Sequence, residues 1–257
     1  MADTPLLELK GATKHFGAVQ ALTEVDFETR AGEVMALVGD NGAGKSTLIK
    51  GIAGIYPFDK GEIYMDGTKV DIHGPRDAAA LGIEIVYQDL ALADNLDVVN
   101  NMYLGRELVT GLRMLDEVSM EQVALETLDS LSVTTIRSVR QQVASLSGGQ
   151  RQAIAVAKAV MWNSRLVILD EPTAALGVAQ THQVLALVRR LADRGLGVVI
   201  ISHNLHDIFE VSDRITVLRL GHRVAQFESN KTTQQEVVHA ITAGTLSHVP
   251  GMEEEKA

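Results

Sequence analysis

Two adjacent carboxylates lie at the end of an apolar run in the stretch ILDEPTAALGV, residues 168–178. Asp170 and Glu171 come directly before Pro172. Two like charges side by side cost free energy unless a cation or a reacting group uses them. The pair therefore predicts a site that holds a metal ion, a water molecule or both. The alternative is a solvated acidic turn.

A glycine-rich stretch, GDNGAGKST, offers a second candidate site. It fits the pattern G-x-x-x-x-G-K-[ST] and lies between an apolar run and the helical stretch TLIKGIAG. Small residues let several backbone N–H groups surround phosphate oxygens, and the helix points its N-terminus at the negative charge. A turn without function is the alternative. The predicted phosphate-binding residues are Gly39, Asp40, Asn41, Gly42, Ala43, Gly44, Lys45, Ser46 and Thr47.

A bound nucleotide would give the carboxylates and two loop residues separate roles. Lys45 would bridge the β- and γ-phosphates, and Ser46 would ligate Mg²⁺. The strand that ends in Asp170 is expected to run parallel to the strand before the phosphate loop. Asp170 should then lie near the Mg²⁺, and Glu171 should project toward the γ-phosphate as a general base or water-orienting group.

Short apolar segments predict the elements that position these residues. Each is apolar on both faces, as strands covered by helices on either side must be. The segment 178–195 shows apolar residues at helical spacing and connects the last two strands, so we expect a doubly wound α/β core with a parallel sheet. The four predicted core strands are residues 33–38, 83–87, 165–170 and 197–202.

The remaining segments predict two additions to this core. Residues 6–32 and 61–72 alternate in the manner of β-strands and contain glycine-rich turns, which indicates an antiparallel β subdomain. From about residue 98 to residue 161 the pattern is helical, so a helical subdomain is inserted between core strands. The charged end, EEEKA, predicts a flexible tail over about 248–257.

Composition narrows the class of protein. The chain has 257 residues, of which 46% are hydrophobic and 22% charged, and this is typical of a globular protein with a sizeable core. A formal net charge of −10 argues against nucleic acid as the main partner. The absence of cysteine excludes disulfides and thiolate sites and fits a reducing compartment. We see neither a secretion signal nor an apolar run of the ~20 residues that a membrane span needs.

A third motif, LSGGQRQ at residues 146–152, completes a resemblance to a known family. With the phosphate loop and the carboxylate pair in this order, the chain resembles the nucleotide-binding domain of ABC transporters over nearly its whole length. The resemblance implies one ABC ATPase domain over residues 1–257, with a P-loop NTPase core. It also implies a head-to-tail dimer in which each copy contacts the γ-phosphate of the ATP held by the other. The contacting residues would be Ser147, Gly148, Gly149 and Gln150.

Other family positions can be matched singly. Gln88 in VYQDL resembles the glutamine that meets Mg²⁺ or the attacking water, and His203 in IISHNL resembles the histidine at the γ-phosphate. Surface polar residues at strand ends are the alternative for both. Phe16 in KHFGAV resembles the aromatic residue on which adenine stacks; the alternative is a hairpin aromatic packed within the small sheet. Gly177 departs from the family, which usually has aspartate there, and this puts the coupling between two ATP sites in doubt.

Within the family, the motifs are most similar to ATPases of sugar importers of the ribose, xylose and fructose type. This implies an ATP- and Mg²⁺-dependent subunit, peripheral on the cytoplasmic face of the inner membrane, that energises a permease served by an external sugar-binding protein. The chain carries one phosphate loop and one LSGGQ motif, so two complete sites require a second copy. The alternatives are an ABC-type ATPase without a permease, acting in metal-cluster assembly, translation or repair, and a regulator that binds ATP without hydrolysing it.

Overall fold

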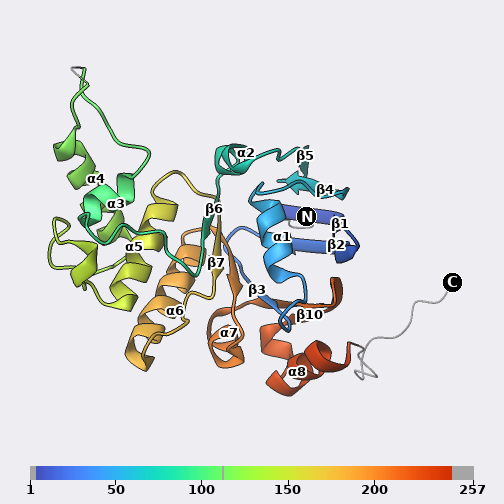
Figure 1. The fold of residues 1–257 in the computed structure, drawn as a ribbon. Coiled ribbons are helices and arrows are strands. Elements are labelled where there is room, and N and C mark those ends of the chain that lie inside the picture. Colours follow the sequence, from blue (N-terminus) through green and yellow to red (C-terminus); the bar gives the residue numbers. More distant parts are fainter. Residues whose placement is uncertain (1–3, 112, 245–257) are drawn as a thin grey trace.

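The computed structural model describes residues 4–111 and 113–244, and the predicted tail at 248–257 lies outside this part of the chain. Figure 1 shows two β-sheets, a group of helices inserted between core strands, and further helices on the faces of the larger sheet. Among the described residues no helix has both the length and the apolar character needed to cross a membrane.

The larger sheet has six strands in the order β10-β9-β3-β8-β7-β6. Its first pair, β10 and β9, is antiparallel, and all other neighbours are parallel. The four predicted core strands are present, and the prediction of a parallel α/β core is confirmed. The sequence patterns did not reveal the other two strands. The bounds are β3 Val34–Val38, β6 Ile83–Val86, β7 Leu166–Asp170, β8 Gly197–Ile201, β9 Arg214–Arg219 and β10 His222–Glu228.

Strand β3 shows why the core strands are apolar on both faces. Val34, Ala36 and Val38 belong to a hydrophobic cluster that includes α6 (Val178–Asp193). The alternate residues Met35 and Leu37 belong to a second cluster that includes α1 (Lys45–Ile52) and the smaller sheet. Every residue of β3 is buried, because side chains alternate between two covered faces.

The smaller sheet is antiparallel, with strand order β2-β1-β4-β5, and it covers the face of the core on which α1 lies (Figure 1). A turn at Gly17 and Ala18 joins its first two strands. This sheet is the antiparallel subdomain predicted from alternation. The bounds are β1 Leu7–Phe16, β2 Val19–Thr29, β4 Lys60–Met65 and β5 Thr68–Val70.

The region of the predicted helical subdomain lies between β6 and β7 in the chain. Its helices pack around buried Met102, Tyr103, Met120 and Ile154. Shorter helices complete the fold around the larger sheet. The bounds are α2 Pro75–Ala80, α3 Val98–Tyr103, α4 Glu117–Ser130, the 3-10 turn Val143–Ser145, α5 Gly148–Val160, α7 Leu205–Val211, the 3-10 turn Ser229–Lys231 and α8 Gln234–Ala243.

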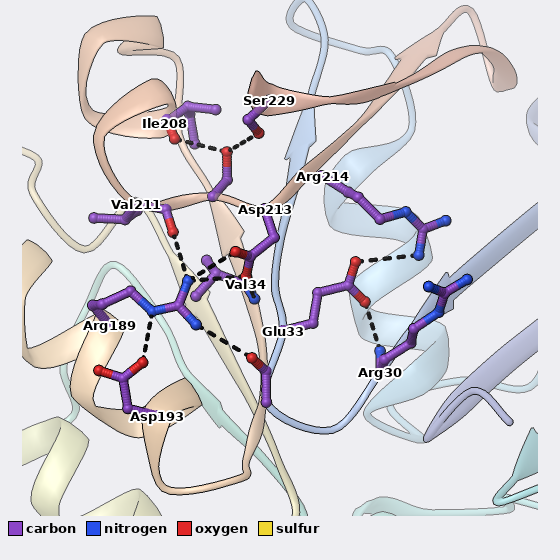
Figure 2. A network of polar contacts seen from close by, with 12 residues as sticks. Arg30, Glu33, Val34, Arg189, Asp193, Ile208, Val211, Asp213, Arg214 and Ser229 are labelled. Atoms are coloured by element: carbon purple, nitrogen blue, oxygen red, sulfur yellow. Dashed lines mark hydrogen bonds and ion pairs between the residues drawn. The ribbon is translucent and has the colours of Figure 1, made fainter. Parts of the chain in front are cut away.

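A polar network anchors α6 to the amino ends of β3 and β9 (Figure 2). The Arg189 guanidinium donates to the Asp213 carboxylate at 2.9 Å and to the Gly32 carbonyl at 3.2 Å. Asp213 also accepts the backbone N–H of Val34 at 2.8 Å. Because α6 begins directly after Gly177, this network holds the helix that follows the 168–178 stretch against the sheet.

A second part of the network joins the start of β3 to β9. Arg214 donates to Glu33 Oε1 at 3.1 Å, and the N–H of Arg30 donates to Glu33 Oε2 at 2.7 Å. Burial raises the pKa of the Glu33 carboxyl, and the charge of Arg214 opposes this rise. The ion pair therefore offsets part of the cost of burying the carboxylate.

Candidate functional site

The phosphate loop joins β3 to α1, and two of its glycines are required by the local geometry. Gly39 has φ +152°, and a Cβ there would collide with the carbonyl oxygen of Leu218. Gly44 precedes α1 with φ +105°, and a Cβ there would lie 2.8 Å from Leu22 Cδ2. Left-handed backbone and tight packing together explain why the pattern needs glycine at both positions.

Lys45, the first residue of α1, holds its ammonium over the loop. Its Nζ donates to the carbonyl oxygens of Gly39 at 2.6 Å and Asp40 at 3.0 Å. Burial lowers the pKa of Lys45, while the charges of Glu171, Asp40 and Asp170 raise it. The Lys45 ammonium is thus partly desolvated and lies near three carboxylates. Such a group can bind a highly charged anion, and a metal ion bound with that anion would offset the charge of the carboxylates.

A cavity of about 470 Å³ brings the predicted residues together. This volume is within the range typical of small-molecule sites. Most of the phosphate loop lines it, including Lys45 and Ser46, together with Gln88, Asp170 and Glu171, so these residues come from three segments of the chain. Residues not singled out from the sequence also line it. These are Val19, Gln20 and Ala21 of β2 and Ile201 of β8.

Asp170 is the last residue of β7, and β8 separates this strand from β3. Burial raises the pKa of the Asp170 carboxyl, and the neighbouring Glu171 raises it further, whereas Lys45 and Lys50 lower it. A nearby cation would therefore stabilise the ionised form of the Asp170 carboxyl. The oxygen donors of Asp170, Ser46 and Gln88 fit the hard ligand set that Mg²⁺ prefers.

Glu171 directs its carboxylate into the cavity from an uncommon backbone conformation. Its φ is +50°, and its backbone N–H donates to the Ile201 carbonyl at 2.9 Å. Its Oε2 lies 2.8 Å from Nδ1 of His203. With Nδ1–H as the donor, the Glu171 carboxylate would accept this hydrogen bond. The contact joins two residues predicted to act together, although His203 itself is 78% exposed.

Phe16 lies at the end of β1, beside a charged cluster that the sequence patterns did not reveal. The Phe16 ring meets the Tyr56 ring edge-on, with centroids 5.1 Å apart, and Tyr56 donates to the Thr47 carbonyl at 3.1 Å. Lys14 Nζ lies 5.6 Å from the centre of the Phe16 ring. The side chain remains 47% exposed, so one part of it packs in the hairpin region while another faces solvent. Its role in stacking adenine stays a prediction.

Lys14 is held by an acid from the segment before β4. Its ammonium donates to Asp59 Oδ1 at 2.9 Å and to the Pro57 carbonyl at 2.8 Å. Asp59 also accepts the backbone N–H of His15 at 2.6 Å. The hydrogen bond from Lys14, with that from His15, lowers the pKa of Asp59 to about 2. The cluster fixes the strand end that carries Phe16.

The LSGGQ motif forms the start of α5. Ser147 caps the helix, and a capping box joins it to Gln150, whose Oε1 accepts the Ser147 N–H at 2.8 Å. A Cβ on Gly148 would lie 2.9 Å from Leu176 Cδ2, so the 168–178 stretch packs against this helix start. The motif does not line the cavity that contains Lys45.

The family profile described as "ABC transporter" matches residues 22–174. The chain belongs to the ABC transporter family. It is 44% identical to a fructose import ATP-binding protein of Rhizobium meliloti, over 94% of this chain and 95% of that protein. It is 46% identical to a xylose/arabinose import ATP-binding protein of Sulfolobus acidocaldarius, over 95% of this chain and 96% of that one. The predicted membership is confirmed, and with it the ABC ATPase class of enzyme.

Solved structures agree with this assignment at the level of the fold. A nucleotide-free ATP-binding cassette from an ABC transporter superposes with a TM-score of 0.78, at 25% identity over 87% of this chain and 91% of that chain. The ADP-bound form of another ABC cassette gives a TM-score of 0.79, at 24% identity over 92% of this chain and 94% of that chain. The predicted ABC-type fold is therefore confirmed.

Gly177, the departure from the ABC pattern, has an ordinary backbone. Its φ of −74° and ψ of 161° are open to any residue, and no atom lies within 4 Å of a Cβ built there. Its N–H donates to Gln180 Oε1 at 3.4 Å. Neither backbone strain nor packing requires glycine at this position, so an aspartate would fit without rearrangement.

Proposed function

We propose that this chain is the ATP-hydrolysing subunit of a monosaccharide importer. One observation carries the hydrolytic part: the contact between Glu171 and His203 at the edge of a cavity that also contains Lys45 and Asp170. A protein that only binds ATP needs no general base held by a second titratable group. Similarity to two sugar-import ATP-binding proteins over more than nine-tenths of this chain supports the importer part.

The hydrolytic step follows from the placement of the side chains. Lys45 and the loop N–H groups bind the β- and γ-phosphates, and Phe16 stacks on adenine. Ser46, Asp170 and Gln88 would hold Mg²⁺, which neutralises charge that develops on the phosphates. Glu171 orients a water for in-line attack and accepts its proton. His203 contacts Glu171 through Nδ1, and its other ring nitrogen, Nε2, would then hydrogen-bond the γ-phosphate.

A second copy of the chain completes each site. Ser147 and Gly148 are exposed at the start of α5, Gly149 is buried, and none of the three lines its own chain's cavity. In a head-to-tail dimer, the N-terminus of α5 and the hydroxyl of Ser147 would meet the γ-phosphate held by the partner. ATP would close this dimer, and hydrolysis would reopen it.

A groove beside the ATP cavity is the proposed docking place for the permease. It has a volume of about 240 Å³ and lies between the segment after β6 and helix α5. Tyr87 and Asp89 line this groove, whereas Gln88 between them lines the ATP cavity. A movement of Gln88 with nucleotide therefore reaches the groove through directly bonded neighbours. Trp162, with the Arg106 guanidinium 5.2 Å from its ring centre, provides an aromatic anchor of the kind that protein interfaces favour.

The proposed location and partners follow from this assignment. The chain would lie on the cytoplasmic face of the inner membrane, bound to permease subunits and only indirectly to an external sugar-binding protein. Sugar selectivity would reside in those partners. Nucleic acid is not a proposed partner, because the net charge is −10.

Recovery from membranes tests the proposal. The chain is purified with its detergent-solubilised partners, and a panel of sugars is screened with the binding protein for stimulation of ATP hydrolysis. We expect membrane recovery and stimulation by one monosaccharide, with no hydrolysis by Lys45→Ala, which also controls for contaminating ATPases. Recovery only in the soluble fraction, without a membrane protein, would favour an ABC ATPase that works without a permease. Undiminished hydrolysis by Lys45→Ala would refute the assigned site.

A further inference from the structure

Arg151 directly follows the LSGGQ motif, in the first turn of α5. Its backbone N–H donates to the Ser147 carbonyl at 2.9 Å. Its guanidinium donates from Nε to the Leu146 carbonyl at 3.3 Å and from Nη2 to the Ala144 carbonyl at 3.2 Å. Because residues 144–146 lead directly into Ser147, these bonds fix the direction from which the chain enters the motif.

The same guanidinium reaches a second segment of the chain, the loop before α3. Nη1 of Arg151 lies 2.9 Å from Asp94 Oδ1. Two backbone hydrogen bonds join the same segments. The N–H of Ala144 donates to the Asp94 carbonyl, and the N–H of Val143 donates to the Leu96 carbonyl, each at 3.0 Å. A planar guanidinium with several donors can hold two carbonyls and a carboxylate together, so Arg151 connects the loop before α3 to the approach to the motif.

Asn101 of α3 holds this loop in place. Its side chain is fully buried. Its Oδ1 accepts the N–H of Ala93 at 2.7 Å, and its Nδ2 donates to the carbonyls of Ala93 and Asp97, both at 3.0 Å. Helix α3 in turn packs against α5 (Figure 1). Residues 93–97 are therefore fixed to α3, and a displacement at the amino end of the loop is carried to Asp94 instead of being absorbed.

The amino end of this segment starts at the ATP cavity. Gln88 lines that cavity, and Asp94 follows it within two turns' length of chain. Between them, Leu90 and Leu92 are partly buried against the core that contains α3 and α5. A continuous series of packed and hydrogen-bonded groups thus runs from Gln88 to Asp94 and across to Arg151.

We propose that Arg151 is a positioning residue that links Gln88 to Ser147. Gln88 belongs to the ATP site of its own chain, whereas Ser147 would meet the ATP held by the partner. Nucleotide in one site would then set the orientation of the LSGGQ motif that the same chain presents to the other site. This inference rests on the proposed function, because only a head-to-tail dimer places the motif at a second ATP. The link needs no carboxylate at residue 177.

Amide hydrogen exchange in the isolated chain tests the link without the dimer. Exchange is compared without nucleotide and with ADP and Mg²⁺, which occupy the cavity but offer a partner no γ-phosphate. We expect nucleotide to change exchange in residues 88–97 and also in residues 143–150. Asp94→Lys replaces attraction to Arg151 by repulsion. It should keep the change in residues 88–97 and reduce that in residues 143–150 by roughly two- to fivefold, the size of effect that an exposed ion pair supports.

Two further variants assign this effect to the ion pair. Asp94→Glu keeps the charge and should respond as the natural chain does. Glu62→Lys changes the net charge as Asp94→Lys does but breaks a surface pair with Lys69 on the smaller sheet, and it should also respond normally. Because the Asp94 side chain is 65% exposed, its replacement leaves the core intact. The proposal would be overturned if residues 143–150 of the natural chain did not respond to nucleotide, or responded equally in Asp94→Lys.

Hydrolysis in the assembled complex separates this inference from the proposed function. Asp94→Lys should lower the rate at saturating ATP by roughly two- to fivefold. The affinity of the isolated chain for ATP should stay within about twofold of the natural value, because Asp94 does not line the cavity. A rate that Asp94→Lys leaves unchanged would refute the link to the partner's site. A natural complex that hydrolyses no ATP would refute the proposed function and leave the exchange result intact.

Discussion

His203 Nδ1 lies 2.8 Å from Glu171 Oε2, although the two residues are 32 positions apart in the chain. The parallel pairing of β7 with β8 brings them together, because Glu171 follows the end of one strand and His203 follows the end of the other. The carboxylate is largely enclosed and the histidine mostly exposed. The exposed partner can therefore respond to a phosphate group or to a second subunit while holding the base in place.

Glu171→Gln keeps the shape of the side chain and removes its basicity. We expect nucleotide binding to be retained and hydrolysis to fall by roughly 10²–10⁴-fold, the usual contribution of a positioned general base. Because ATP then persists, the dimer should accumulate with ATP and Mg²⁺. Gel filtration and a steady-state ATPase assay measure both effects. Glu210→Gln is the matched control, since Glu210 contacts His182 instead. A Glu171→Gln chain that stays monomeric with ATP and Mg²⁺ would count against the shared site.

Phe16→Ala separates the two interpretations of this aromatic residue. If adenine stacks on Phe16, affinity for ATP should fall by roughly 5- to 150-fold, which corresponds to about 1–3 kcal/mol for stacking of one base. Phe16→Trp should restore it. If the ring only packs against Tyr56, ATP affinity stays constant and the free energy of unfolding falls. Equilibrium binding of a fluorescent ATP analogue and urea denaturation distinguish these outcomes.

The ion pair between Lys14 and Asp59 makes stability depend on pH. The pKa of Asp59 is about 2 in the folded chain, below its ordinary value of 3.8. The ionised carboxylate therefore stabilises the fold in full at pH values above 3.8. That contribution is lost as pH falls from about 4 toward 2. A double-mutant cycle with Asp59→Asn and Lys14→Met, followed by urea denaturation, measures it. The coupling energy should be constant from pH 7 to about 5 and shrink below pH 4. A coupling that grows on acidification would contradict the assignment.

The strands could be predicted where their apolar runs were continuous. The runs that became β3, β7 and β8 are short, almost wholly apolar and buried in the structure. Strand β9, with the sequence RITVLR, carries an arginine at each end and a threonine within it, so it resembled an ordinary surface segment. It is buried because it pairs with β3, whose residues lie nearly 180 positions earlier in the chain. That pairing could not be deduced from the local sequence.

The candidate site was predictable for a different reason. Phosphate binding needs a compact loop, so Gly39 and Lys45 lie close together in the chain and form a recognisable pattern. Contacts between distant charged residues leave no such pattern. The sequence could not predict the ion pairs of Lys14 with Asp59 and of Arg189 with Asp213, because a single lysine or aspartate usually indicates only a solvated surface.

Arg189→Met tests the anchoring of α6. The methionine keeps much of the apolar stem but loses the hydrogen bonds to Asp213 and Gly32 (Figure 2). Because Arg189 is 33% exposed, we expect a loss of about 1–2 kcal/mol in the free energy of unfolding, between the values for surface ion pairs and for buried charged hydrogen bonds. Arg194→Met, which removes a single bond to Ser130, should cost less. Urea denaturation measures both, and an equal or larger loss for Arg194→Met would contradict the anchoring role.

Gly177→Asp tests the position at which the resemblance to the ABC family leads us to expect an aspartate. Aspartate fits the extended backbone there and would cap α6, so the free energy of unfolding should rise by a few tenths of a kcal/mol. In the assembled complex, the new carboxylate would offer the partner's phosphate loop a hydrogen bond that the natural chain lacks. We therefore expect a changed Hill slope in the dependence of hydrolysis on ATP concentration. Gly177→Ala, which adds a Cβ without a carboxylate, should leave that slope unaltered. The same slope in all three chains would show that communication between the two ATP sites does not pass through residue 177.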